Sequence, residues 1–173
     1  MNKNNYTRFA ALAGLIFIAA LTRLIDHPAN ISPIMAIAIF GGAYFSDKRL
    51  AFILPLLAMA LSDLILGFYL ISMFVYLSFG LGIFLGFALK NRIKVRNVFF
   101  AALSGSVLFF LITNLGSWLT DPMYQPLSIE SLIRCYELAI PFFRNTLIGD
   151  MAYVTALFGS FALAEKYVPV LQK

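Results

Sequence analysis

The chain contains apolar runs that are too long and too free of charge to be covered by water. Between Leu50 and Leu89 it has 40 positions and a single charged side chain, Asp63. A helix needs roughly 20 mostly apolar residues to cross the ~30 Å hydrocarbon core of a bilayer. This stretch is therefore too long for one membrane-spanning helix. It has the length of two, joined by a tight turn near residues 67–72.

The same criterion predicts six membrane-spanning helices in the whole chain. Pro28 precedes the second of them, Pro33 lies in its first turn and Gly41-Gly42 lies within it, so we expect it to be tilted or irregular at its outer end. No small-residue cleavage site follows the first, which is expected to be a retained anchor. The fold class is thus predicted to be an all-α integral membrane protein, a six-helix bundle in one domain. The spans are expected at residues 9–25, 31–46, 49–68, 71–89, 98–119 and 146–165.

The composition excludes the main alternatives to a membrane protein. Hydrophobic residues make up 61% of the chain and charged residues 12%, whereas a soluble domain has about 25% charged residues. Disorder requires low hydrophobicity and high charge, so it is excluded as well. With one cysteine and one histidine, neither a disulfide scaffold nor a multi-histidine metal site can form. We expect no metal and no cofactor.

The basic residues outside the predicted spans gather on one side of the membrane. Cytoplasmic segments of membrane proteins are rich in Lys and Arg. When alternate segments are counted, ten basic residues fall on one side and three on the other, and both termini are expected in the cytoplasm with the ten. The net charge of +5 therefore needs no nucleic-acid partner. The ten are Lys3, Arg8, Lys48, Arg49, Lys90, Arg92, Lys94, Arg96, Lys166 and Lys173, and the three are Arg23, Arg134 and Arg144.

Polar side chains within the predicted spans are concentrated in the outer half of the bundle. An ionisable group at the centre of a span costs roughly 2.5–3.5 kcal/mol on insertion scales, so it needs a partner, a water-filled cavity or a function. Helical spacing places Asp150 on one face with Thr146 and Tyr153. We expect such faces to line a cavity that opens outward and binds a small polar molecule. The candidate ligand-binding residues are Arg23, His27, Asn30, Asp63, Asn114, Trp118, Tyr136, Arg144, Asn145 and Asp150.

Two interpretations of the buried charges stay open. In the first, Asp63 and Asp150 form ion pairs that only hold the bundle together, with Arg23 and Arg144 as their partners. In the second, these arginines and His27 meet an anionic group of a ligand. The aspartates and Asn114 then form hydrogen bonds with the ligand, and nearby aromatic side chains stack on it.

The outer segment between the last two spans has the pattern of an amphipathic helix over residues 128–140. Apolar residues recur at helical spacing on one face, and charged residues lie on the other. Ser128 is the expected N-cap, and Pro141 is expected to end the helix. Such a helix would lie in the membrane interface as a connector or as a lid over the cavity. Cys135 is expected to be a packing residue, with a reactive thiol as the alternative.

Small residues recur at every fourth position on two predicted spans. They are Ala10 and Gly14 on the first, and Ser78, Gly82 and Gly86 on the fourth. Small residues allow helices to approach closely in lipid. These faces are expected either to pack within the monomer or to dock a partner membrane protein. The basic segment 90–96 could contact anionic lipid head groups or a partner.

Several stretches of the chain resemble a family of small, uncharacterised bacterial inner-membrane proteins. They are residues 23–45, with Pro-Ala-Asn-Ile-Ser-Pro and Phe-Gly-Gly-Ala-Tyr-Phe, residues 61–64 (Leu-Ser-Asp-Leu), residues 109–114, and residues 140–150 (Ile-Pro-Phe-Phe-Arg-Asn-Thr-Leu-Ile-Gly-Asp). That family is similar in size, six-span layout and topology to the substrate-binding S components of energy-coupling factor (ECF) transporters. The resemblance implies a multi-pass protein of the bacterial inner membrane.

The likeness to S components also implies a pocket near the outer face for a vitamin or its precursor. It implies two kinds of partner, a transmembrane coupling subunit and cytoplasmic ATPases. The sequence has no Walker motif, so the ATPase must be a separate chain. The Ala-x-x-x-Ala that often docks the coupling subunit corresponds here to Ala10-x-x-x-Gly14. The nickel and cobalt members begin Met-His, whereas this chain begins Met-Asn, which argues against a metal-ion substrate.

The expected function is therefore a membrane-embedded binding and uptake subunit for a vitamin-like or other small polar micronutrient. One alternative is a solitary carrier that couples transport to protons through Asp63 or Asp150. A second is an intramembrane hydrolase that uses the two aspartates as an acid–base pair. A third is a scaffold protein without a ligand. No catalytic residue is assigned.

Overall fold

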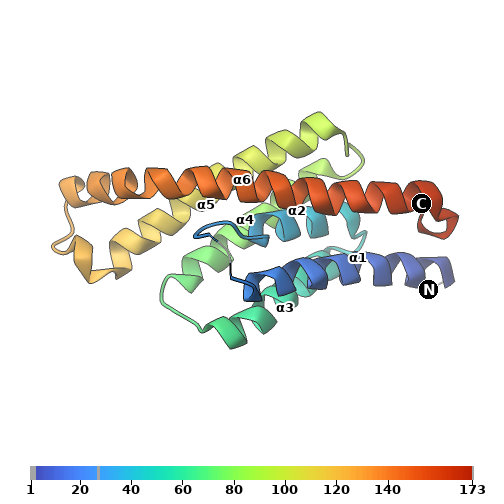
Figure 1. The fold of residues 1–173 in the computed structure, drawn as a ribbon, viewed down its shortest axis with the longest axis horizontal. Helices are drawn as coiled ribbons and strands as arrows, with labels where there is room; N and C mark the ends of the chain where they lie inside the picture. The colour runs from blue at the N-terminus through green and yellow to red at the C-terminus, as the bar shows by residue number, and fades with distance from the viewer. Residues whose placement is uncertain (1–2, 27, 173) are drawn as a thin grey trace.

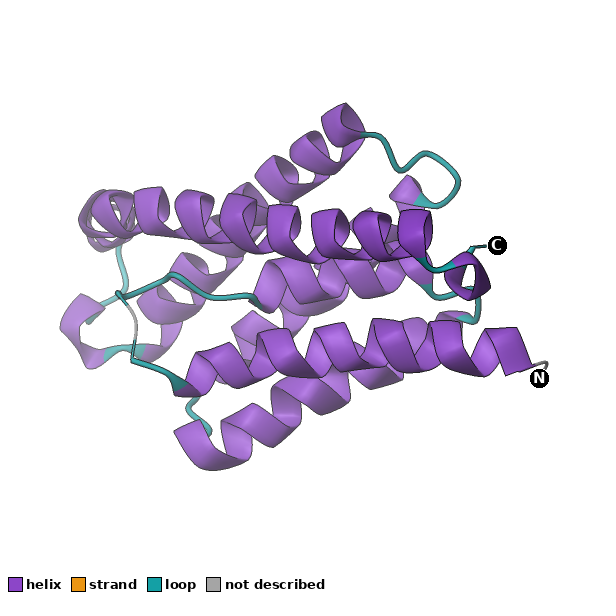
Figure 2. Cartoon of the chain, turned by 45° about the vertical axis from the view of Figure 1, so that its right-hand side comes forward, coloured by secondary structure: helices purple, strands orange, loops and turns teal. Residues whose placement is uncertain are grey.

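The computed structural model describes residues 3–26 and 28–172 and folds them into six α-helices (Figure 1). Short 3-10 helices, Thr22–Leu24, Pro122–Tyr124 and Pro169–Leu171, follow three of them. The described residues contain no strand. Both termini lie at the same end of the bundle, which we call the inner end (Figure 2). The helices are α1 (Lys3–Leu21), α2 (Ile34–Tyr44), α3 (Lys48–Leu66), α4 (Ser72–Leu89), α5 (Val95–Thr120) and α6 (Ile129–Tyr167).

Five helices of the described chain are long and apolar enough to cross a membrane. They are the first, Asn5–Leu24, together with α3, α4, α5 and α6. Their outward faces carry large apolar side chains, such as Leu64, Ile65 and Met73, each at least 70% exposed. A water-soluble monomer rarely exposes apolar surface on this scale. The architecture is consistent with a multi-pass membrane protein. Helices occupy all six predicted spans, with most ends within a few residues of the prediction.

The short helix α2 lies at the centre of the bundle and contacts all five other helices. All eleven of its residues are buried, and a helix of that length is only about 16 Å long, roughly half of the ~30 Å hydrocarbon core. The predicted span over residues 31–46 is therefore wrong in length. Pro33 is the N-cap, and the chain before it is irregular. Irregular backbone at membrane depth is tolerated where it is enclosed by protein or lines a cavity.

Glycine residues allow α2 to lie directly against α4. A Cβ atom at Gly86 would lie 2.8 Å from the Cα of Gly42, and one at Gly82 would lie 2.9 Å from the Cβ of Ala38. Together with Ser78, these α4 residues are fully enclosed. The face of α4 that carries Ser78, Gly82 and Gly86 is thus buried within the chain, and Gly82 and Gly86 meet α2 there.

The first turns of α1 are fastened to the end of the chain. Arg8 Nη1 lies 2.6 Å from Glu165 Oε1 and also donates a hydrogen bond to the carbonyl oxygen of Leu171. Next to these contacts of Arg8, Ala10 is exposed, and a Cβ atom at Gly14 would meet nothing within 4 Å. The small-residue face of α1 therefore stays open.

The last helix, α6, runs without interruption for 39 residues, or about 58 Å. The sequence predicts that a helix ends at Pro141, so that an interfacial helix (128–140) is separate from a span (146–165). That prediction is wrong. Pro141 is exposed and lacks the N–H that would bind the carbonyl group of Glu137, yet the helix continues through it. The N-cap prediction is confirmed, because the side chains of Ser128 and Ser131 each accept a hydrogen bond from the other's backbone N–H.

Candidate ligand-binding site

A cavity of about 280 Å³ lies beside the N-terminus of α2, towards the outer end of the bundle. Its volume is close to the lower end of the roughly 300–1,000 Å³ that is usual for ligand sites. Five of the nine lining side chains are polar, although the chain as a whole is 61% hydrophobic. The lining residues are Arg23, Asn30, Ser32, Ile34, Met35, Leu66, Phe109, Thr146 and Asp150.

The cavity exists because the irregular segment before α2 is held against α6. Asn145 Nδ2 donates to the Ala29 carbonyl oxygen at 3.0 Å, and Thr22 Oγ1 lies 2.9 Å from the hydroxyl of Tyr153. Between them, a Cβ atom at Gly149 would lie 3.1 Å from the Cα of Ile31. These contacts fix a non-helical wall at a depth where the short α2 leaves room.

Asn30 allows this wall to turn sharply. The Ile31 N–H donates to the Pro28 carbonyl oxygen at 3.1 Å, and Asn30 within the turn has a φ of 66°. Asparagine adopts this left-handed conformation more readily than most residues. The turn brings Asn30 to the cavity.

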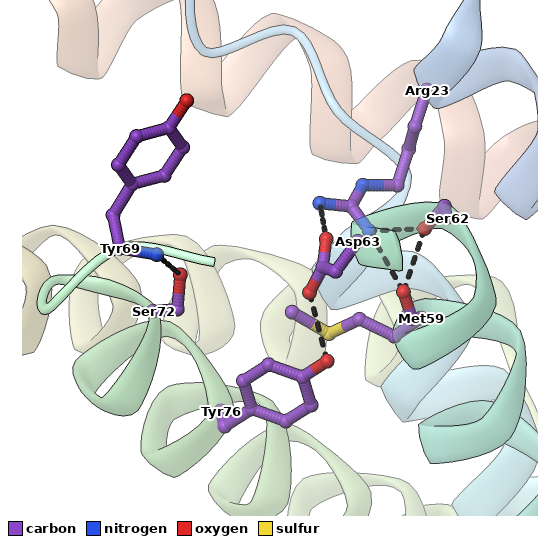
Figure 3. Close-up of polar contacts among 7 residues, drawn as sticks. All are labelled: Arg23, Met59, Ser62, Asp63, Tyr69, Ser72 and Tyr76. Carbon is purple, nitrogen blue, oxygen red and sulfur yellow. Dashed lines mark hydrogen bonds and ion pairs between the residues drawn. The ribbon is translucent and has the colours of Figure 1, made fainter. Parts of the chain in front are cut away.

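Next to the cavity, Arg23 and Asp63 form a buried ion pair (Figure 3). Arg23 Nη2 lies 2.6 Å from Asp63 Oδ1, and the two side chains are only 11% and 6% exposed. Arg23 also donates to Ser62 Oγ and, at 3.3 Å, to the carbonyl oxygen of Met59. The hydroxyl of Tyr76 donates to the other Asp63 oxygen at 2.8 Å.

This network joins the end of α1 to α3 and α4. Both carboxylate oxygens of Asp63 have a partner, as a charge at this depth requires. The positive charge of Arg23 is matched by a carboxylate within contact distance. The first of the two interpretations, in which ion pairs hold the bundle together, therefore fits Asp63 and Arg23.

Asp150 has a different environment. It is 3% exposed, and it forms no ion pair with any described residue. Its one hydrogen bond there is with Ser106, whose Oγ lies 2.6 Å from Asp150 Oδ2. The same hydroxyl lies 3.0 Å from the Ala102 carbonyl oxygen. The predicted pairing of Asp150 with Arg144 is wrong, because Arg144 is exposed and lies outside the cavity lining.

Ser32 brings a second unused polar group to the cavity. Its Oγ is buried and has no hydrogen-bond partner among the described residues. An unsatisfied buried hydroxyl costs roughly 1–3 kcal/mol. Ser32 and Asp150 thus both present hydrogen-bonding capacity that the described protein does not use.

Three predicted site residues lie instead in the contact between α5 and the first turns of α6. Trp118 Nε1 donates to Ser131 Oγ at 2.9 Å, and the Tyr136 hydroxyl donates to the Leu111 carbonyl oxygen at 2.7 Å. Asn114 Nδ2 donates within its own helix, at 2.7 Å, to Phe110. None of the three lines the cavity.

Cys135 lies in the same contact and is buried, 1% exposed, as expected of a packing residue. Its Sγ donates to the Asn114 carbonyl oxygen at 3.4 Å. Tyr124, outside the spans, packs nearby. Burial, together with a hydrogen bond to Cys135, raises the pKa of the Tyr124 hydroxyl above its ordinary value of 10.0.

The structure brings Arg23, Asn30 and Asp150 of the candidate set to the cavity, while Asn145 holds its wall. His27 lies outside the described residues. The candidate set lacked Ser32, Thr146 and Ser106. Helical spacing already groups Thr146 with Asp150 on the face expected to line the cavity, although Thr146 was not in the candidate set. The two serines carry no signal that separates them from packing residues.

A second groove, of about 310 Å³, lies between the first turns of α5 and the second half of α6. Its lining is apolar except for Lys94, Thr155 and the hydroxyl of Tyr44. It lacks the convergent polar groups of the outer cavity, which is therefore the better candidate for specific recognition.

The fold is all-helical and consistent with a multi-pass membrane protein, with a cavity rich in polar side chains near one end of the bundle. The chain belongs to a family of unknown function, DUF6580, whose model matches residues 3–171. This match agrees with the resemblance to uncharacterised proteins and provides no link to ECF S components. Neither a curated protein nor a solved structure matches the chain.

Proposed function

We propose that the protein is a binding subunit of the bacterial inner membrane that holds a small polar molecule in the outer cavity during uptake. The observation that carries the proposal is the cavity itself, where five polar side chains converge inside an apolar bundle. Two of them, Ser32 and Asp150, have unused hydrogen-bonding capacity among the described residues. A ligand with complementary groups would satisfy both.

The charge distribution supports an outward orientation of the cavity. Nine of the thirteen Lys and Arg residues belong to described segments at the inner end of the bundle. From the positive-inside rule we expect that end in the cytoplasm and the cavity towards the outside. The similarity in layout to ECF S components extends the proposal to a vitamin-like micronutrient, a coupling subunit and separate ATPases.

The aspartyl hydrolase alternative has less support in the arrangement of the two carboxyl groups. Such a mechanism needs both carboxyls at one water molecule. Asp63 is engaged with Arg23 and Tyr76, and only Asp150 lines the cavity. A ligand-free scaffold would not require a polar cavity of this size.

The proposal is tested by what co-purifies with the protein. The full chain is purified in lipid nanodiscs, and its small molecules are released and identified by mass spectrometry. In a Thr146→Phe variant the new ring occupies the cavity, so the co-purified molecule should fall at least tenfold. Ser160→Phe is the matched control, because Ser160 is an exposed hydroxyl residue on the same helix.

Melting temperatures of both variants show that the comparison is made between folded proteins. Loss of the molecule in Thr146→Phe but not in Ser160→Phe supports the proposal. If folded wild type and Thr146→Phe retain the same molecules in equal amounts, the cavity is not the binding site.

A further inference from the structure

We infer that the ligand of the outer cavity carries a positively charged nitrogen, of the ammonium or amidinium type, that binds the carboxylate of Asp150. The inference rests on the proposed function and adds the chemical class of the ligand. It reverses the expectation of an anionic ligand, which depended on the arginines and on His27.

Among the described residues, the cations near the cavity are not available to an anion. Arg23 is paired with Asp63 at 2.6 Å, and Arg144 is exposed and does not line the cavity. The remaining positive element is the N-terminus of α2, at Ile34 and Met35, which amounts to roughly half of a unit charge. An ionised Asp150 contributes a full negative charge. With Asp150 ionised, the described part of the cavity is therefore net negative.

Apart from Arg23, whose N–H groups are engaged with Asp63, Ser62 and Met59, the polar side chains that line the cavity can all accept hydrogen bonds. Asp150 has a second carboxylate oxygen without a partner among the described residues, and Ser32 Oγ has none at all. The hydroxyl of Thr146 lies 3.3 Å from the Phe142 carbonyl oxygen, so its lone pairs are free to accept. An ammonium group has three donors and no acceptor, which matches this set.

The carbon skeleton of such a ligand would lie against apolar side chains. Ile34, Met35, Leu66 and Phe109 form the rest of the lining. A buried carboxylate without a counter-ion costs several kcal/mol, and a cationic ligand supplies that counter-ion. The site therefore gains more from a cation than from a neutral molecule of the same shape.

The charge preference of the cavity can be measured without knowing the ligand. Cys135 is the only cysteine in the chain, so Cys135→Ser gives a background in which Thr146→Cys places one thiol in the cavity. The thiol is treated with trimethylammonioethyl, sulfonatoethyl or methyl methanethiosulfonate, which are cationic, anionic and neutral. Gln125→Cys, an exposed position, gives the intrinsic reactivity of each reagent.

At residue 146 the cationic reagent should react at least about tenfold faster than the anionic one, relative to the same ratio at residue 125. Asp150→Asn should bring this preference close to one. Asp26→Asn removes an equal charge from the exposed surface of the segment before α2 and should leave it unchanged. If Thr146→Cys does not fold, Asn30→Cys is a second reporter on the cavity wall.

The outcomes separate this inference from the proposed function. A preference for the anionic reagent, or one that Asp150→Asn does not alter, overturns the cationic ligand but leaves an accessible cavity. A co-purified molecule without a basic nitrogen overturns it as well. If no reagent reacts at residue 146 or 30 while residue 125 reacts, the cavity is closed and both ideas fail.

Discussion

A methyl group added at Gly86 should force the central helix away from α4. The Cβ of Gly86→Ala would lie 2.8 Å from the Cα of Gly42, whereas ordinary contacts begin at 3.4 Å, so the two backbones must separate by at least about 0.6 Å. The carbonyl oxygen of Ile39 is closer still. Because α2 is buried along its whole length, it cannot shift without pressing on other helices.

Overpacking of this kind costs about 1–3 kcal/mol. For a chain of this size each kcal/mol corresponds to about 2–4 °C, so the melting temperature of Gly86→Ala should fall by about 2–12 °C. The assay is thermal unfolding in detergent with a thiol-reactive fluorescent dye. Cys135 suits this assay because it is the only cysteine and is 1% exposed in the folded protein.

Gly80→Ala is the matched control on the same helix. A Cβ atom at Gly80 would meet nothing within 4 Å, and replacing a helical glycine by alanine favours the helix by about 0.5–1 kcal/mol. Its melting temperature should stay the same or rise slightly. If Gly86→Ala melts with or above the wild type, or if Gly80→Ala falls as far, the close contact of α2 and α4 does not limit stability.

Two further predictions concern the polar contacts. Arg23→Gln or Asp63→Asn alone should lower the free energy of unfolding by about 3–5 kcal/mol, because each leaves the other charge buried without a partner. The double variant should lose less than the sum of the two. Strictly additive losses in the dye assay would argue against the ion pair. Trp118→Phe removes the indole N–H donated to Ser131 and should cost about 1 kcal/mol. It should also speed the labelling of Cys135 well below the melting temperature, and unchanged labelling would mean that this bond does not hold α5 and α6 together.

The membrane helices could be predicted because hydropathy reports directly on what lipid tolerates. The length of α2 could not, because a wholly apolar run has the same composition whether it spans a bilayer or is enclosed by protein. Pro141 misled for a related reason. Its cost depends on whether water or protein can satisfy the freed carbonyl group, which the surroundings of the helix decide.

The charged residues of the candidate site could be predicted from the sequence, but which of them form ion pairs could not. The scarcity of charge singled out Arg23, Asp63 and Asp150. Which of them neutralise one another depends on how helices distant in sequence meet. Helical spacing also puts Asn114 and Trp118 on one face of α5, but it does not show that this face turns towards α6 and not towards the cavity.

Because α6 is unbroken, a tilt of the helix at Asp150 would move both of its ends. Asp150 lies 15 residues from Glu165 at the inner end and 19 from Ser131 at the outer end, or about 22 Å and 28 Å along the axis. A tilt of about 5° around Asp150 would displace these ends by about 2 Å and 2.5 Å. That movement is enough to break the ion pair of Arg8 with Glu165 or the hydrogen bond of Trp118 with Ser131. A change at the cavity that tilts α6 would therefore be transmitted to both ends of the bundle.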